Sequence, residues 1–255
     1  MQKLAIGIAA IAALTGTPAL AADMALKSAP PTLPLPTWTG FYLGAHIGGG
    51  AESNASGSWF DPNIGGIPSP LAVPTQSEAG FVGGVQAGYN WQFAPTWVVG
   101  IEGDFSASGI DSQGNLAPVP SVLVGGSRLT MSTRSGRLAS ARGRFGYIAG
   151  NTLWYATGGA AWDDVKYIGN GVFGGGFTDA TSFWHTNAGW VAGGGVEWMV
   201  TPHFLVRAEY LYYGFDKSVI GNAPYVPTFF GAVSPVFTWS GYNIQVGRLG
   251  LDYKF

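Results

Sequence analysis

The chain has 255 residues, a formal net charge of −2, 14% aromatic residues, 41 glycines and no cysteine, and only 10% of its residues are charged. The lack of Cys excludes disulfides, Cys-based metal sites and a lipid-modified Cys, and the weak charge gives no indication of a nucleic-acid partner. Soluble domains carry roughly 25% charged residues, so this composition argues against an ordinary soluble domain.

The N-terminus has the pattern of a secretory signal peptide. Lys3 supplies a positive charge, residues 4–14 are apolar, and residues 19–21 form a small-x-small cleavage site. The apolar stretch is too short to span a bilayer as a helix, which makes a retained anchor the weaker alternative. We therefore expect a signal peptide over residues 1–21 and a proline-rich periplasmic linker over residues 22–37.

The remaining chain, residues 38–255, is predicted to be a membrane barrel. No apolar run after residue 20 approaches the length of a transmembrane helix. Within lipid, only helices and closed barrels satisfy every backbone hydrogen bond. The prediction is an all-β fold: an eight-stranded antiparallel transmembrane β-barrel of the bacterial outer membrane, surrounded by lipid and lipopolysaccharide. A soluble β-protein with the aromatic residues in its core is the alternative.

Eight segments show the period of two that a strand with two different faces requires. In the first, Phe41, Leu43 and Ile47 share one face. The eight segments cover residues 40–50, 80–93, 97–110, 139–147, 152–167, 187–200, 204–212 and 242–255. In the last segment, the apolar residues occupy even positions before Gly247 and odd positions after it. This change indicates either a bulge or an exit of the strand from the membrane.

The connections between these segments alternate in length. Those near Pro95, Asn151 and Pro202 are short, whereas residues 52–79, 111–131, 168–185 and 216–241 form four long ones. Short turns are typical of the periplasmic side of a barrel and long loops of the extracellular side. A periplasmic aromatic girdle is predicted beside the short turns, at Trp91, Phe93, Trp97, Trp198, Phe204, Tyr253 and Phe255.

The fifth segment is ambiguous, because Trp154 and Trp162 share parity with Asp164 and Lys166. We assign its outward face to Leu153 and Tyr155. A cation facing lipid at the bilayer midplane would cost roughly 2–4 kcal/mol, so charged residues of the other parity are assigned to the lumen. This predicted lumen charge network consists of Glu102, Asp104, Arg142, Arg144, Asp164, Lys166, Glu197, Arg207, Glu209, Arg248, Asp252 and Lys254.

An eight-stranded barrel is only wide enough for side chains to fill it. We therefore favour a hydrogen-bonded plug in which Gln86, Asn90 and Gln92 join the charges. The alternative is a narrow water-filled path that selects small ions, for which the inward glycines would leave room.

No catalytic, metal or cofactor site is predicted. His185 lies near Ser182 and Thr181, but the sequence indicates no carboxylate that would orient it as a catalytic base. His46 and His203 lie far apart in the strand pattern, which indicates no metal cluster. Glu102 and Asp104 resemble a catalytic carboxylate pair, but lumen arginines favour charge pairing instead. The glycine-rich stretch at residues 171–177 lacks the Lys-Ser/Thr of a phosphate loop.

The chain resembles small outer-membrane proteins of alphaproteobacteria, the outer-membrane immunogenic or porin-family proteins, which are related to opacity-type and outer-membrane protein A-like barrels. The resemblance rests on WTGFYLGAHIGGG at residues 38–50, GGVQAGYNWQF at residues 83–93 and RLGLDYKF at residues 248–255. It implies an envelope-supporting barrel, with small-pore activity in some members. The sequence departs from full-length outer-membrane protein A in one respect, since we expect no peptidoglycan-binding domain after the barrel. The resemblance also implies that Leu249, Leu251, Tyr253 and Phe255 form an insertion signal for the barrel-assembly machinery.

Two functions stay open at this point: a structural envelope protein, expected to be a monomer, whose loops contact a surface ligand, and a low-conductance porin. Aromatic residues in the predicted loops favour contacts at the surface or at the outer membrane interface. These residues are Trp59, Phe60, Phe183, Trp184, Phe229, Phe230 and Trp239.

Overall fold

The computed structural model describes residues 37–60, 70–116, 128–173, 177–223 and 234–255. The expected signal peptide and all of the expected linker but residue 37 lie outside these ranges. In the part of the chain that is described, no helix is long and apolar enough to cross a membrane.

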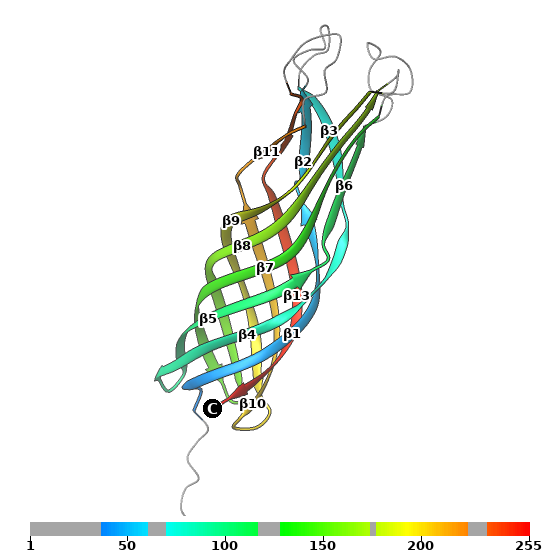
Figure 1. Ribbon diagram of the computed structural model, residues 1–255. Helices are drawn as coiled ribbons and strands as arrows, with labels where there is room; N and C mark the ends of the chain where they lie inside the picture. Colours follow the sequence, from blue (N-terminus) through cyan, green and yellow to red (C-terminus); the bar gives the residue numbers. More distant parts are fainter. Residues whose placement is uncertain (1–36, 61–69, 117–127, 174–176, 224–233) are drawn as a thin grey trace, which may run out of the picture. The chain divides into compact units, whose positions relative to one another are not determined.

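Eight strands form a closed antiparallel ring (Figure 1). They are β1 (Gly40–Ser53), β4 (Ala79–Ala94), β5 (Trp97–Ser108), β7 (Arg128–Ala149), β8 (Thr152–Phe173), β9 (Phe177–Met199), β10 (Phe204–Phe215) and β13 (Tyr242–Lys254). Each pairs with the next, and β13 closes the ring by pairing with β1 from Tyr42↔Lys254 to Ser53↔Asn243. The predicted eight-stranded barrel is confirmed, and closure leaves no strand edge exposed at the level of the ring.

Five shorter strands lie where long loops were predicted. They are β2 (Ser56–Phe60), β3 (Leu71–Ser77), β6 (Asp111–Leu116), β11 (Val219–Asn222) and β12 (Val236–Trp239), paired in the order β11-β12-β2-β3-β6-β7. The ring strands β7 and β8 also stay paired as far as Arg128↔Val172, with a register shift between Ser135 and Arg137. Much of each predicted loop is therefore strand, because backbone groups that leave the membrane still pair with one another.

Two belts of exposed aromatic side chains bound the lipid-facing band. The periplasmic belt comprises Trp91, Phe93, Trp97, Tyr147, Trp154, Trp198, Phe204, Tyr253 and Phe255, and the outer belt comprises Phe81, Phe105, Trp162 and Trp190. On β5 the belts are the eight residues from Trp97 to Phe105 apart, or about 20 Å along the barrel axis for a tilted strand. This height suits the hydrocarbon core of an outer membrane.

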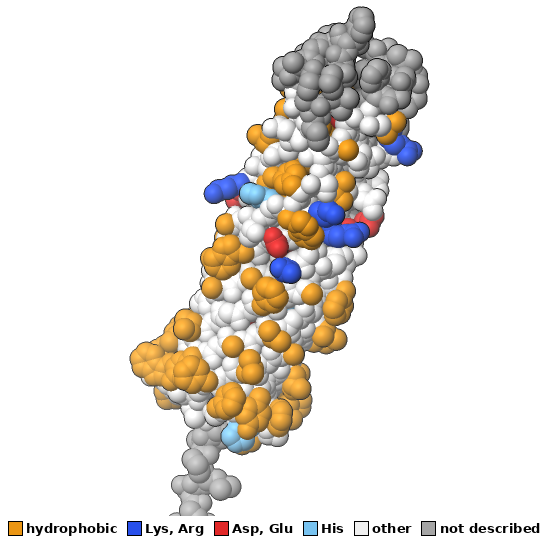
Figure 2. Space-filling view, viewed as in Figure 1, with side chains coloured by type: hydrophobic (Ala, Val, Ile, Leu, Met, Phe, Trp, Pro, Cys, Tyr) orange, Lys and Arg blue, Asp and Glu red, His pale blue; other side chains and the backbone are white. Residues whose placement is uncertain are grey.

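Exposed charges begin above the outer belt. Arg134 Nε lies 3.3 Å from Asp111, and Arg137 Nη1 lies 3.9 Å from Asp164. On the face shown in Figure 2, the lower part carries hydrophobic side chains and the acidic and basic ones lie above them. The described strands therefore extend beyond the lipid-facing band on this side.

The parity assigned to the fifth predicted segment is wrong. Leu153 is 0% exposed and faces the lumen with Tyr155, whereas Trp154 is 59% exposed. Asp164 and Lys166 share the outward parity of Trp154 and are not lumen residues, whereas Asp163 is fully buried. The physical reason is that the segment passes through the outer belt at Trp162, above which an outward charge meets water instead of lipid.

The change of surroundings above the outer belt also explains the pattern of the last segment. β13 pairs with β1 from Asn243 to Lys254 and with β10 from Tyr242 to Tyr253, both without a register shift, so the register contains no bulge near Gly247. Ile244 and Val246 are buried inside, and Gln245 is on the outside. The strand leaves the membrane there, where polar side chains face outward and apolar ones face inward.

Candidate functional site in the barrel lumen

The lumen holds three layers of side chains. The periplasmic layer is formed by the buried apolar residues Trp38, Val98, Leu153, Met199 and Leu205 and by the ring of Tyr155, whose hydroxyl reaches the next layer. A layer of ion pairs follows at the level of the membrane. The outer layer is a larger apolar cluster that includes Val82, Ile110, Leu138, Val191, Leu211, Ile244 and Val246.

The middle layer, here called the ion-pair network, joins nine of the twelve predicted lumen charges. Its members are Glu102 and Asp104 on β5, Arg142 and Arg144 on β7, Glu197 on β9, Arg207 and Glu209 on β10, and Arg248 and Asp252 on β13. The side chains are at most 2% exposed. Period-two spacing on neighbouring strands brings them together, because directly opposed residues point to the same face.

Direct cross-strand partners of opposite charge build the network. Glu102 is opposite Arg142, Glu197 is opposite Arg207, and Glu209 is opposite Arg248. Arg142 also lies 2.9 Å from Glu209, on the far side of the barrel, and Arg207 lies 2.8 Å from Asp252 on the neighbouring strand. Arg207 contacts Glu102 on β5 as well, so the guanidinium groups of Arg142 and Arg207 link opposite walls through the lumen.

Glu102 is the hub of this network. Its carboxylate contacts Arg142 and Arg207, and Tyr42 donates its hydroxyl hydrogen to it. Removing one partner of such a buried pair typically costs about 3–5 kcal/mol, because the other charge stays buried without compensation.

Sequence reasoning missed three polar members of the layer. Tyr42 accepts a hydrogen bond from Arg144 at 3.0 Å, and Tyr155 donates to Glu209 at 3.0 Å while its ring lies 4.0 Å from the Arg144 guanidinium. His46 donates through Nδ1 to Gln86 Oε1 at 2.9 Å, and Gln86 donates to Asp252 at 2.6 Å. The inward parity of Tyr42 and His46 was the signal that could have identified them.

The other predicted lumen residues lie elsewhere. Lys254 is buried at the periplasmic end and donates to the backbone carbonyl of Thr37, and Gln92 accepts from the backbone N–H of Trp38 at 3.0 Å. Asn90 is buried in the lumen. Asp164 and Lys166 are outside, as described above. Leu249, Leu251, Tyr253 and Phe255 of the predicted insertion signal are all exposed on the outer wall.

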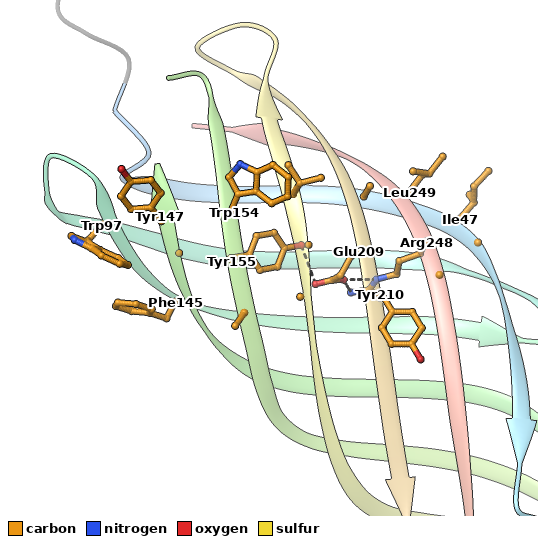
Figure 3. Close-up of a pocket in the computed structure, with 18 residues that line it drawn as sticks. Ile47, Trp97, Phe145, Tyr147, Trp154, Tyr155, Glu209, Tyr210, Arg248 and Leu249 are labelled. Carbon is orange, nitrogen blue, oxygen red and sulfur yellow. Dashed lines mark hydrogen bonds and ion pairs between the residues drawn. The ribbon is translucent and has the colours of Figure 1, made fainter. Parts of the chain in front are cut away.

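A hollow of about 990 Å³ lies along the barrel wall (Figure 3). Its floor includes the small residues Ala156, Gly194 and Ala208. Figure 3 shows Glu209 bonded to Tyr155 and Arg248 on the inner side of the wall. The side chains of Glu209 and Arg248 are at most 1% exposed, so the hollow belongs to the lipid-facing surface and not to the lumen.

The outer apolar layer contains aromatic residues that the sequence assigned to surface loops. Trp59 and Trp239 are 2% and 3% exposed, and Phe183 packs against them as a partly buried residue. Phe60 and Trp184 are exposed, while Phe229 and Phe230 lie outside the described residues. The surface-contact interpretation is therefore wrong for the first three, because these strands continue the barrel and enclose a core.

The described residues also locate the side chains considered for chemistry. Ser182 and His185 lie exposed on β9, above the membrane. No group of three or more His, Asp and Glu side chains in the described ranges could hold a metal ion.

Comparison with known proteins agrees with this architecture. A family model described as the outer membrane protein beta-barrel domain matches residues 8–255. The 31 kDa outer-membrane immunogenic protein of Brucella melitensis biotype 1 is 34% identical over 260 residues, which cover 97% of this chain and 98% of the relative. The 22 kDa outer membrane protein of Rhizobium leguminosarum bv. viciae is 31% identical over 225 residues, covering 88% and 82%.

Among solved structures, the outer membrane protein OprG from Pseudomonas aeruginosa is similar with a TM-score of 0.48 and 12% identity, over 85% of this chain and 96% of that one. The family model spans nearly the whole sequence, and the first relative is aligned end to end. The chain therefore belongs to the outer membrane protein beta-barrel family and is a protein of the bacterial outer membrane.

Proposed function

We propose that the protein is a closed structural barrel, which supports the outer membrane and presents its extended strands and loops to the exterior. The observation that carries this proposal is the layered lumen: an ion-pair network with side chains at most 2% exposed lies between two buried apolar clusters. Solutes would have to cross both clusters and break buried ion pairs to pass.

The inward glycines support the same conclusion. A Cβ atom on Gly88 would lie 2.4 Å from the Tyr42 hydroxyl, and one on Gly195 would lie 2.7 Å from the Tyr155 hydroxyl. Tyrosine rings thus fill the space that these glycines leave. The glycines serve close packing across the lumen and do not add up to a water path.

The alternative function is a low-conductance porin, which the charged lumen favours. Planar-bilayer recording of the refolded protein separates the two. The closed barrel is expected to give no stable conductance steps. Stable steps whose amplitude changes when Glu102 or Arg142 is reversed in charge would overturn the proposal, provided that the variants keep the heat-dependent gel mobility of a folded barrel.

We further propose that the chain acts as a monomer without enzymatic activity and that its last strand is read by the barrel-assembly machinery. The terminal Leu249, Leu251, Tyr253 and Phe255 support the last point, since they alternate along the outer wall and end in the periplasmic aromatic belt. Size measurement of the detergent-solubilised protein tests the monomer. A dimer stable to dilution would contradict it.

A further inference from the structure

Two buried acids lie above the membrane without a basic partner. Glu52 on β1 is 3% exposed and Asp163 on β8 is 0% exposed. Five other buried carboxylates, in the ion-pair network, each face an arginine. Among the described residues, neither Glu52 nor Asp163 forms an ion pair. Both lie beyond the outer aromatic belt, where the barrel projects from the lipid.

The two carboxylates differ in how they are satisfied. Asp163 accepts hydrogen bonds from Ser135 and from the Tyr242 hydroxyl, both at 2.7 Å. Glu52 Oε2 accepts one long bond of 3.3 Å from Thr133, and Glu52 Oε1 has no hydrogen-bond partner among the described residues. A buried carboxylate oxygen left in this state is costly unless something else compensates it.

A small cavity lies against Glu52. Its volume is about 10 Å³, enough for one water molecule or one bare ion. Oxygen-bearing side chains from at least six strands line it, among them Glu52, Ser56, Thr75, Thr133, Tyr167 and Tyr242. Tyr242 also binds Asp163, so the second carboxylate is one side chain removed from the cavity.

We propose that this cavity is a binding site for a single calcium ion, held by the Glu52 carboxylate and the surrounding hydroxyl oxygens. Ca²⁺ is a hard cation that accepts about six to eight oxygen ligands in irregular geometry. Mg²⁺ retains its waters and demands a regular octahedron, for which a cavity of this volume has no room. A divalent charge would balance Glu52 and Asp163 together.

The electrostatic surroundings of Glu52 favour the binding of a cation. The charged groups near it are Asp163 from β8 and Asp111 from β6, and Asp111 is paired with the exposed Arg134. Burial, reinforced by repulsion from Asp163, raises the pKa of Glu52 to about 7, and burial raises the pKa of Asp163 to about 6. Both shifts have the same cause, negative charge that is buried without a basic partner nearby.

The test uses the full-length mature protein, folded in detergent micelles free of lipopolysaccharide and stripped with a chelator. Thermal unfolding is measured at pH 8 with Ca²⁺, Mg²⁺ or Na⁺ at equal ionic strength. Calcium is expected to raise the midpoint by several degrees, and Mg²⁺ and Na⁺ are expected to have little effect. Equal shifts from all three salts, or no shift, would overturn the proposal.

Two variants make the test specific. Glu52→Gln removes the charged ligand with little change of shape and should abolish the calcium shift. Asp164→Asn removes the neighbouring acid that faces outward, and this variant should keep the calcium shift. A shift that survives Glu52→Gln would place the ion elsewhere and refute the site.

A second measurement does not depend on the variants folding. Terbium bound in the cavity would be sensitised by Tyr167, Tyr242 and Trp239, which line it. The wild-type protein should show terbium luminescence that Ca²⁺ displaces and Mg²⁺ does not. Luminescence that Ca²⁺ fails to displace would contradict the proposal.

Discussion

Replacement of Arg142 by Met tests whether the middle of the lumen is dry. Arg142 contacts Glu102, lies 3.2 Å from Asp104 and 2.9 Å from Glu209, and all of these side chains are at most 2% exposed. The variant leaves five network carboxylates facing three arginines. Breaking such buried pairs costs about 3–5 kcal/mol, and we expect the free energy of unfolding to fall by that amount.

The matched control is the same substitution at Arg137, on the same strand. Its side chain is 69% exposed and 3.9 Å from Asp164, so Arg137→Met should change the free energy of unfolding by less than about 0.5 kcal/mol. Both variants are compared by equilibrium urea unfolding in phospholipid vesicles, followed by Trp fluorescence and by heat-dependent gel mobility.

A double variant checks the cause of the loss. Arg142→Met combined with Glu102→Gln restores a single excess carboxylate, four facing three arginines, and should be more stable than Arg142→Met alone. A cost below about 1 kcal/mol for Arg142→Met would mean that water screens these charges. The closed-lumen reasoning would then fail, and a hydrated path would account for the result.

Three further predictions address the ends and the packing of the barrel. Deletion of Phe255 should lower the amount of protein in the outer-membrane fraction more than it lowers the unfolding free energy of the refolded protein. Without calcium, the Glu52 carboxyl alone should lower the stability by about 3 kcal/mol as pH rises from 4.5 to about 7, because the folded state holds its proton more tightly than the unfolded state does. Gly88→Ala should destabilise the barrel, since the new Cβ would meet the Tyr42 hydroxyl at 2.4 Å and the Ile101 carbonyl oxygen at 2.6 Å.

Each of these has a control in the chain. Phe204→Ala removes another exposed aromatic of the same belt and should leave outer-membrane levels closer to wild type than the deletion does. Glu52→Gln should remove the Glu52 part of the pH dependence of urea unfolding and leave the part that comes from Asp163, whose pKa burial raises to about 6. Stability that rises over this pH range would contradict the sign. Gly247→Ala places a Cβ with nothing within 4 Å; a cost equal to that of Gly88→Ala would show that packing is not the cause.

The ring was predictable because lipid imposes one rule on every strand within it. Phe41, Leu43 and Ile47 face outward for the same reason as Leu249 and Leu251, and the period of two followed from that. Glu102 and Arg142 could be assigned to the lumen by the same rule. Their direct pairing across β5 and β7 needed the register, which the sequence does not display.

The rule that outward-facing residues are apolar no longer holds where the strands leave the lipid. Asp164 and Lys166 face water beyond Trp162, and Ile244 faces inward on β13. Above the lipid, the outward positions of these strands are therefore polar and the inward positions are apolar. Trp59 and Trp239 were assigned to loops because their segments show no lipid-facing pattern. They pack instead into the outer apolar core, and the pairing of β2 with β12 places them beside the ring residues of that core.

The lumen compensates its buried acids in two different ways. At membrane level, apolar layers on both sides keep solution ions away, and arginines on neighbouring strands supply the positive charge permanently. Above the membrane, Glu52 and Asp163 face hydroxyl groups, so a proton or a bound ion must supply the positive charge. A fixed arginine keeps its charge at any physiological pH, whereas an ion or proton is exchanged with the medium. On the calcium proposal, the network therefore fixes the barrel within the membrane, and the outer acids make the stability of its exposed end depend on the external medium.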